Sequence, residues 1–216
     1  VNLVKQIKQK HDLAITLSIG ERPRQEYARL FEAGADRYLM RFETSNPELY
    51  RTLHPDSRFE ERIESLNWLK EIGYQVGSGS LIGLPGQTIN DLAQDILTFQ
   101  KFDLDMVGVG PFISHPETPL AGGPNGTVEM TFKVIALTRI VTRNVHIPAT
   151  TALATLQPAD GREEALQLGA NVVMPNITPA KYRPLYELYP AKICVNEEAD
   201  QCHGCIRQRI QSLNRP

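Results

Sequence analysis

The chain has 216 residues, of which 41% are hydrophobic and 22% are charged, with 23 Lys and Arg against 25 Asp and Glu. This composition is typical of a globular protein, and at this length one domain can bury a sizeable core. A formal net charge of −2 provides no basic surface for phosphates, which disfavours nucleic-acid binding. No apolar run reaches the roughly 18 to 20 residues of a membrane-spanning helix, so we expect a cytoplasmic protein without membrane contact.

The first ten residues have the pattern of an amphipathic helix. Apolar Val1, Val4 and Ile7 recur at helical spacing from the first residue onward, and no initiator methionine precedes them. A helix of this kind needs an earlier element to pack against. We therefore expect the chain to be the C-terminal part of a longer protein.

Helix and strand patterns then alternate along most of the chain, which predicts βα units. Several predicted helices end at a glycine suited to a left-handed cap, as at Gly34, Gly73 and Gly169. The helices are expected to begin near Pro23, Phe59, Ile89, Thr127 and Arg162. The strands are expected at residues 13–20, 36–44, 74–84, 105–113, 145–153 and 170–176.

Six βα strands fit two fold classes. An eight-stranded (β/α) barrel usually needs about 250 residues, and two further units of about 30 residues upstream would complete it. An open doubly wound sheet usually carries a glycine-rich phosphate turn after its first strand, and no G-x-G-x-x-G follows Leu13–Gly20. The pattern therefore favours the barrel.

Several predicted strands carry polar side chains on one face. Because side chains alternate along a strand, residues 36–44 have an apolar face for the helices and a polar face for the barrel interior. Thr16 and Ser18 share one face of residues 13–20 in the same way, and Thr150 and Thr151 lie in residues 145–153. The apolar face of residues 36–44 comprises Tyr38, Met40 and Phe42, and the opposite face comprises Arg37, Leu39, Arg41 and Glu43.

Inward charges have two interpretations. They form either a buried salt-bridge network that fixes strand register or a polar cavity for an amino-acid-like or other anionic ligand, because guanidinium donors match carboxylate oxygens. Met106 and Met174 either line that cavity or fill the core. The glycine-rich segment 77–88 either lets the backbone approach a ligand or permits tight packing of strand and loop.

All three cysteines, Cys194, Cys202 and Cys205, lie within the last 23 residues. An odd number disfavours a complete disulfide framework. Their close spacing instead predicts a metal site.

Five segments together resemble a known family, the HydE radical SAM enzymes that mature [FeFe]-hydrogenase. The resemblance extends from about residue 1 to the cysteine tail, and the occurrence of all five strings in order makes it specific. The segments are GADRYLMRFET, GSGSLIGLPGQT, DMVGVGPFISHPETPL, IPATTAL and ANVVMPN.

The resemblance implies a (β/α)8 TIM-type barrel of the radical SAM type, with strands 3 to 8 present here. Residues 1–190 would form this partial barrel, and residues 191–216 a cysteine-containing tail packed on it. The family uses S-adenosylmethionine (SAM) and a [4Fe-4S] cluster held by a Cys-x3-Cys-x2-Cys loop. That loop is absent from these 216 residues, so the catalytic cluster ligands are not assigned and the chain alone is expected to be inactive.

Position by position, the resemblance assigns Glu43 and Arg62 to the amino and carboxylate ends of the methionine part of SAM. Arg41 would lie beside them, and Ser18 would face SAM or the substrate. The spacing Cys194-x7-Cys202-x2-Cys205 matches a second iron–sulfur site found in part of the family. A zinc site with His203 or simple free thiols are the alternatives. The family's substrate cavity would be lined by Thr16, Ser18, Arg37, Met106, Thr150, Thr151, Met174 and Tyr189.

The expected activity is generation of a 5′-deoxyadenosyl radical for assembly of the di-iron subcluster of the hydrogenase. Its substrate would be a small or organometallic molecule, and other hydrogenase maturation proteins would be its partners. Two relatives with the same barrel, methylornithine synthase and biotin synthase, are the alternative enzymes. The alternative that is not an enzyme is a non-catalytic barrel that binds a ligand.

Overall fold

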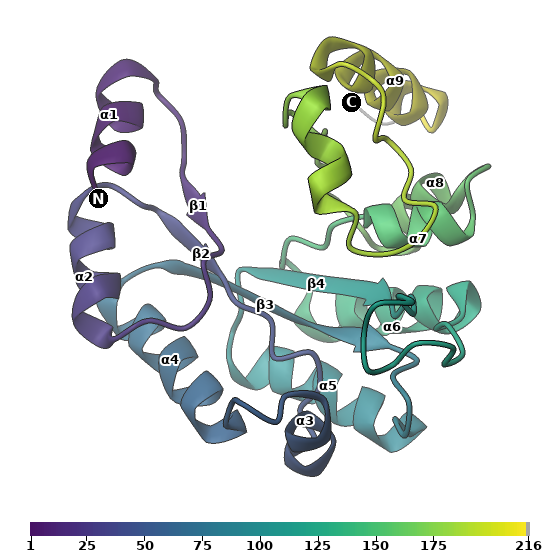
Figure 1. The fold of residues 1–216 in the computed structure, drawn as a ribbon, viewed down its shortest axis with the longest axis horizontal. Helices are drawn as coiled ribbons and strands as arrows, with labels where there is room; N and C mark the ends of the chain where they lie inside the picture. Colours follow the sequence, from purple (N-terminus) through teal and green to yellow (C-terminus); the bar gives the residue numbers. More distant parts are fainter. Residues whose placement is uncertain (215–216) are drawn as a thin grey trace. The chain divides into compact units, whose positions relative to one another are not determined.

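The computed structural model describes residues 1–214 and divides the chain into two compact units. Unit 1 comprises Val1–Ser80 and Thr88–Gly108, and unit 2 comprises Leu81–Gln87 and the residues from Val109 onward. Figure 1 labels the α-helices and strands of both. None of the described helices is both long and apolar enough to span a membrane.

The strands form one sheet in the order of the sequence, β1-β2-β3-β4. Their bounds are β1 Thr16–Leu17, β2 Arg37–Leu39, β3 Gln75–Ile82 and β4 Met106–Pro111. The first two pairings are parallel, with Thr16 opposite Arg37 and Arg37 opposite Gln75. This consecutive order agrees with the predicted barrel, since the strand order of a doubly wound sheet reverses at a switch point.

The last two strands were predicted far longer than they are in the structure. Residues 145–153 and 170–176 meet only at one isolated parallel bridge, between Pro148 and Val172. The first of these segments turns into helix α7 (Thr151–Leu156), because the side chain of Thr150 accepts a hydrogen bond from the amide of Leu153 and caps the helix. The first two predicted strands are also shorter than expected, although Glu43 still pairs with Ser80 through a bridge.

In unit 1, three helices begin within one residue of the predicted starts at Pro23, Phe59 and Ile89, whereas the helix Pro47–Leu53 was not predicted. Thr88 and Asp91 form a capping box. In this unit α2 packs against α4, as Figure 1 shows. The bounds are α1 Asn2–Lys10, α2 Arg24–Glu32, α3 Pro47–Leu53, α4 Phe59–Ile72 and α5 Ile89–Lys101.

The alternation predicted for residues 36–44 is confirmed. Tyr38, Met40 and Phe42 are buried, whereas Arg37 is exposed and Arg41 and Glu43 are half-buried. Phe42 stacks on Phe99 of α5 at a centroid distance of 5.6 Å, and Tyr38 meets Tyr27 of α2 edge to face at 5.1 Å. The apolar face therefore packs on helices, and the other face remains available for polar chemistry.

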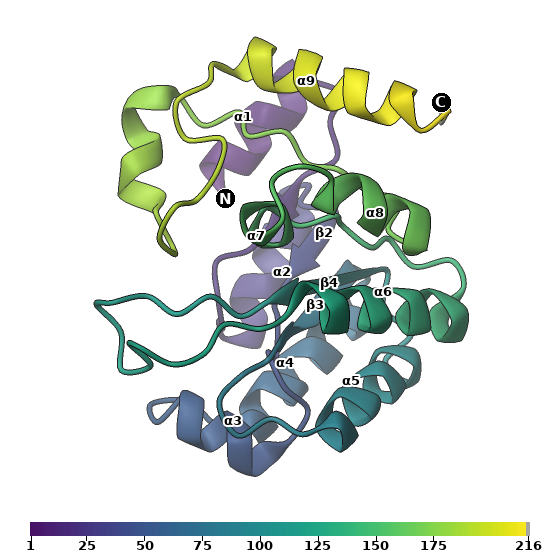
Figure 2. The same ribbon diagram turned by 90° about the vertical axis from the view of Figure 1, so that its right-hand side faces the viewer.

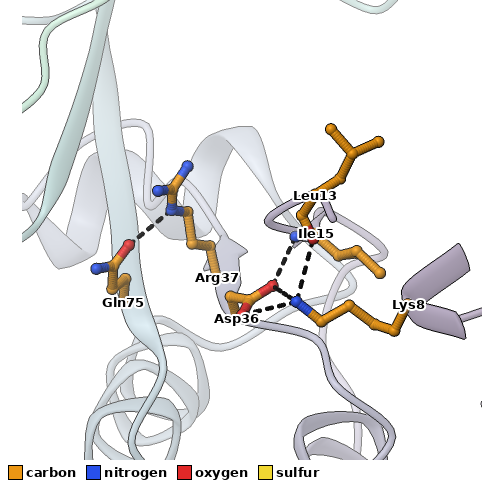
Figure 3. A network of polar contacts seen from close by, with 6 residues as sticks. All are labelled: Lys8, Leu13, Ile15, Asp36, Arg37 and Gln75. Atoms are coloured by element: carbon orange, nitrogen blue, oxygen red, sulfur yellow. Dashed lines mark hydrogen bonds and ion pairs between the residues drawn. The ribbon is translucent and has the colours of Figure 1, made fainter. Parts of the chain in front are cut away.

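A polar network ties α1 to the start of the sheet (Figure 3). Asp36 accepts hydrogen bonds from the Ile15 amide at 2.7 Å and from Lys8 Nζ at 2.9 Å. Burial opposes ionisation of Asp36, but these contacts outweigh it and lower its pKa. Arg37 Nε donates to Gln75 Oε1 at 2.6 Å, so Arg37 joins neighbouring strands at this end of the sheet.

The glycine-rich segment serves tight packing, which was one of its two predicted roles. A Cβ atom on Gly79 would lie 2.0 Å from the carbonyl oxygen of Gly108. In unit 2, a Cβ on Gly126 would lie 1.8 Å from the carbonyl oxygen of Ile82. Only glycine permits such close backbone approaches.

In unit 2 the helices α6, α7 and α8 pack against one another (Figure 2). The segment after α8 forms a 3-10 helix, η1, and then the helix that carries two of the cysteines, α9. The bounds are α6 Val128–Thr142, α7 Thr151–Leu156, α8 Gly161–Leu168, η1 Ala180–Tyr186 and α9 Ala199–Ser212.

Candidate functional site

A charged pair follows strand β2 in unit 1. Arg41 Nη2 lies 3.0 Å from Glu43 Oε2, and the same nitrogen donates to the carbonyl oxygen of Ser80 at 2.6 Å. About a quarter of each side chain is exposed. Arg41 Nε is buried and has no hydrogen-bond partner among residues 1–214. The pair therefore retains unused hydrogen-bonding capacity, as a binding site requires.

Glu43 has an unusual backbone conformation, with a φ angle of 64°. Left-handed conformations cost free energy for a side chain of this size, so they persist only where the surroundings impose them. The Glu43 amide donates to the carbonyl oxygen of Gly79 at 3.0 Å. This contact fixes the start of the loop of residues 43–46.

Two acidic residues of α5 hold the rest of this loop. Asp95 Oδ1 accepts hydrogen bonds from the amide and the hydroxyl of Ser45, both at 2.6 Å. Asp91 Oδ1 accepts from Asn46 Nδ2 at 2.9 Å. Asp95 is fully buried, and burial raises its pKa to about 6 although the hydrogen bonds from Ser45 lower it.

The raised pKa of Asp95 predicts a pH-dependent stability. The unfolded chain releases the Asp95 proton near pH 4, whereas the folded chain keeps it until about pH 6. The folded state thus binds more protons in this window, and the free energy of unfolding should fall by roughly 2 to 3 kcal/mol as the pH rises through it. Urea unfolding at several pH values should show a flatter profile for Asp95→Asn, which retains an acceptor for Ser45. Asp12→Asn, at an exposed position, should keep the wild-type profile; equal profiles for all three proteins would contradict the prediction.

Arg62 is not a solvated helix residue. Its Nε lies 2.7 Å from Glu21 Oε1, and its side chain is 18% exposed. Arg62 Nε also contacts the Tyr50 hydroxyl at 3.2 Å, and Nη1 donates to the carbonyl oxygen of Arg41 at 3.2 Å. The structure thus brings Arg62 beside the backbone that leads to Glu43.

His54 belongs to the same group of side chains. Burial lowers its pKa, and Glu43, Arg62 and Glu21 are the charged residues that act on it. Its ring lies 4.6 Å from that of Tyr50. The cluster therefore presents two carboxylates, two guanidinium groups and an imidazole with a lowered pKa in one unit. Such alternating charges can bind both ends of a zwitterion.

The other predicted residues of unit 1 are not members of these ion pairs. Thr16 and Ser18 are exposed, and Arg37 contacts Gln75 as described above. Met106 is half-buried and packs against Gly77.

Unit 2 holds the remaining predicted residues. Thr150 caps α7, and Tyr189 is half-buried beside Thr155. Thr151 and Met174 line a cavity of about 260 Å³ together with Cys194 and Cys202. Two of the predicted cavity residues, Thr151 and Met174, therefore line the same cavity as two of the cysteines, which the sequence order did not indicate.

The three cysteines are not arranged as a ready metal site. Cys202 is buried and Cys205 exposed on α9, and Cys194 precedes the helix with a φ angle of 61°. Within residues 1–214, no three Cys, His, Asp or Glu side chains are close enough together to hold a metal ion. The second iron–sulfur site and its zinc alternative with His203 stay predictions.

Sequence reasoning missed Glu21, Tyr50, His54 and the two aspartates of α5. Glu21 and His54 lie outside the predicted strands, so alternation provides no signal for them. Glu21 contacts Arg62, and the aspartates contact Ser45 and Asn46, each across about 40 to 50 residues of sequence. Local sequence patterns therefore give no signal for these contacts.

A protein-family model and related proteins match this chain. The family model of the radical SAM superfamily matches residues 2–99. The [FeFe] hydrogenase maturase subunit HydE of Thermotoga maritima is 54% identical over 214 residues, which are 99% of this chain and 61% of that protein. A 3-methylornithine synthase of Methanosarcina acetivorans is 30% identical over 80% of this chain and 48% of that protein.

Solved structures of similar proteins have the same fold as this chain. Methylornithine synthase superposes with a TM-score of 0.82 at 27% identity, over 99% of this chain and 61% of that chain. A structure of the FeFe-hydrogenase maturase HydG from Carboxydothermus hydrogenoformans has a TM-score of 0.73 at 22% identity, over 97% of this chain and 49% of that chain, which shows the shared fold. The fold is that of part of a radical SAM (β/α) barrel. This chain spans about three fifths of the HydE relative.

Proposed function

We propose that this chain is part of a radical SAM enzyme, a SAM-cleaving maturase of [FeFe]-hydrogenase. The 54% identity to the Thermotoga maritima HydE protein supports this proposal over the alternatives. The observation that carries it is the cluster of Glu21, Arg41, Glu43 and Arg62, whose charges suit the amino-acid end of SAM.

The residues of this cluster have distinct roles in the proposal. Glu43 binds the ammonium group of the methionine part, and Arg62 binds its carboxylate. Each currently has a partner within the chain, Arg41 for Glu43 and Glu21 for Arg62. Binding therefore exchanges these partners for the ligand, with Arg41 as a neighbouring donor and Ser18 facing SAM or the substrate.

The backbone and hydrogen bonds around the cluster hold its charged side chains in place, so that they can orient SAM. The left-handed backbone of Glu43, the hydrogen bonds of Ser45 to Asp95 and the contact of Arg62 with the Arg41 carbonyl limit how far these side chains move. Such positioning holds the sulfonium of SAM in a fixed place relative to the charges that bind its amino-acid end. A reduced [4Fe-4S] cluster, whose Cys-x3-Cys-x2-Cys ligands are not among these 216 residues, supplies the electron that cleaves SAM when bound.

The substrate and the partners are proposed from the resemblance. Thr16, Arg37 and Met106 of unit 1 and Thr150, Thr151, Met174 and Tyr189 of unit 2 would contact a small or organometallic substrate. Other hydrogenase maturation proteins would supply and receive it. We also propose a cytoplasmic location, because three free cysteines are typical of a reducing compartment. The division into a barrel at residues 1–190 and a tail at residues 191–216 is retained as a proposal.

The second iron–sulfur cluster is tested by metal analysis. After anaerobic reconstitution of the full-length protein, the wild type should contain more iron and sulfide than a variant with Cys194, Cys202 and Cys205 all replaced by serine. The physical reason is that three thiolates bind iron far better than three hydroxyls. Because the described cysteines are not preassembled, binding requires the segment before α9 to move. Equal iron in both proteins, or zinc alone, would refute the second cluster.

A second candidate is a methylornithine-synthase-like enzyme, favoured by the TM-score of 0.82. SAM cleavage separates both enzymes from a non-catalytic barrel. The full-length, reconstituted protein should form methionine and 5′-deoxyadenosine when reduced, and Glu43→Gln should form much less. Tight SAM binding without any cleavage under reducing conditions would instead identify a binding module.

A further inference from the structure

Helix α5 contributes a buried carboxylate whose contacts lie outside the proposed SAM cluster. Asp91 lies in the first turn of α5 and is 8% exposed. Its Oδ2 accepts hydrogen bonds from the amide and the hydroxyl of Thr88, both at 2.7 Å, and its Oδ1 accepts one from Asn46 Nδ2 at 2.9 Å. The bond from the Thr88 amide does most to lower the pKa of Asp91, although burial opposes this, so the group is an ionised acceptor at neutral pH.

The contact with Asp91 determines which way the side-chain amide of Asn46 points. An ionised carboxylate only accepts hydrogen bonds, so the amide nitrogen of Asn46 faces Asp91 and the amide oxygen faces away from it. That oxygen accepts hydrogen bonds from the backbone amides of Glu48 at 3.0 Å and Leu49 at 3.2 Å, and it thereby caps the N-terminus of α3. Asp91 therefore orients the cap of a helix to which it does not belong.

Helix α3 in turn carries a residue that supports Arg62. The hydroxyl of Tyr50 accepts a hydrogen bond from Arg62 Nε at 3.2 Å, and the guanidinium carbon of Arg62 lies 5.9 Å from the centre of the Tyr50 ring. Tyr50 is fully buried, and its backbone amide donates to the carbonyl oxygen of Asn46 at 2.9 Å. The position of Tyr50 therefore depends on the capped first turn of α3.

We propose that Asp91 is a positioning residue for SAM binding, which acts through Asn46 and α3 to hold Tyr50 against Arg62. The inference rests on the proposed function, in which Arg62 binds the SAM carboxylate. When SAM takes the place of Glu21, the Tyr50 hydroxyl remains a contact that holds the Arg62 side chain. A guanidinium that is already held in one orientation loses less conformational freedom on binding, so the ligand binds more tightly.

The effect of Asp91 should be confined to one end of SAM. Glu43, which is proposed to bind the ammonium group, lies in a loop that Asp95 holds through two hydrogen bonds from Ser45, both at 2.6 Å. The two carboxylates of α5 therefore support opposite ends of the ligand. Decarboxylated SAM keeps the ammonium and the sulfonium but lacks the carboxylate, so its binding should not depend on Asp91.

The test is calorimetric titration of the full-length, reconstituted protein with SAM and with decarboxylated SAM. Asp91→Ala should bind SAM about 3- to 10-fold more weakly than the wild type does, which corresponds to the loss of about one net hydrogen bond. The same variant should bind decarboxylated SAM with wild-type affinity, because this probe lacks the group that Arg62 binds. A general loosening of the structure would instead weaken the binding of both ligands.

Exchanging the two side chains tests the contact itself. Asn46→Asp keeps a good cap for α3 but places a second carboxylate against Asp91, so it should weaken SAM binding at least as much as Asp91→Ala does. The double variant Asn46→Asp/Asp91→Asn restores one donor and one acceptor, with the amide now at position 91, and should recover most of the wild-type affinity. Thr88→Ala is the matched control, because it removes the N-cap of α5 but leaves the contact of Asp91 with Asn46, and it should bind SAM as the wild type does.

The outcomes separate this inference from the proposed function. If Arg62→Ala weakens SAM binding whereas Asp91→Ala does not, Arg62 binds SAM as proposed and Asp91 has no positioning role. Equal weakening of SAM and decarboxylated SAM binding by Asp91→Ala, or no recovery of affinity in the double variant, would also overturn the inference. Wild-type affinity of Arg62→Ala for SAM would refute both the proposed role of Arg62 and the inference that rests on it.

Discussion

Replacing Arg62 with alanine in the full-length enzyme should weaken SAM binding about 10- to 100-fold. The variant removes the guanidinium proposed to bind the SAM carboxylate, and a charge-assisted hydrogen bond of this kind contributes about 1.5 to 3 kcal/mol. Arg62 contacts the Tyr50 hydroxyl and the Arg41 carbonyl, so the side chain is positioned before the ligand arrives. Calorimetric titration with SAM measures the effect directly.

Two controls make this result specific. Arg207→Ala, at an exposed position of α9, should bind SAM as the wild type does. Glu21→Gln removes the competing partner of Arg62 and should bind SAM at least as tightly as the wild type, whereas a merely structural role of the pair would weaken binding in both variants. If Arg62→Ala binds SAM with wild-type affinity, Arg62 does not hold the carboxylate.

Replacing Gly79 with alanine should destabilise the protein by about 3 kcal/mol or more, or prevent folding altogether. The new Cβ would lie 2.0 Å from the carbonyl oxygen of Gly108, and backbone on both sides of the contact must shift to relieve this overlap. The same shift would displace the Glu43 amide, which donates to the Gly79 carbonyl. Urea unfolding gives the free energy of unfolding, and the yield of folded protein covers the severe case.

Gly108→Ala is the matched control on the facing strand. A Cβ on Gly108 would have its nearest neighbour, the Ser78 carbonyl oxygen, at 3.7 Å, which is ordinary van der Waals contact. This variant should therefore be much more stable than Gly79→Ala. Equal stability of the two variants would show that the close approach at Gly79 does not exist in solution.

The sequence predicted the elements of the fold that are determined by a local residue pattern. The period-two alternation of Tyr38, Met40 and Phe42 identified their buried face. The starts of α2, α4, α5, α6 and α8 lie within one residue of the predicted positions, whereas α3, α7 and α9 were not predicted. The strand at residues 145–153 was predicted too long because a β-rich composition does not show that Thr150 caps a helix. The hydrogen bond from the Leu153 amide to the Thr150 side chain begins the helix inside the predicted strand, and the residue pattern does not reveal this bond.

The candidate site was predictable only in part. Alternation placed Arg41 and Glu43 on the polar face, and the resemblance added Arg62, which the helix pattern alone describes as a surface residue. Glu21 and Asp95 required the fold itself, because their partners Arg62 and Ser45 are distant in sequence.

Hydrogen evolution tests most directly the proposal that the full-length protein matures [FeFe]-hydrogenase. The inactive hydrogenase would be incubated in a maturation mixture that lacks only its HydE-type enzyme, with SAM and reductant present. We predict that adding the full-length protein restores hydrogen evolution and that adding Glu43→Gln does not. SAM cleavage by the wild-type protein without any hydrogen evolution, together with formation of 3-methylornithine, would contradict the account and identify the methylornithine-synthase-like alternative.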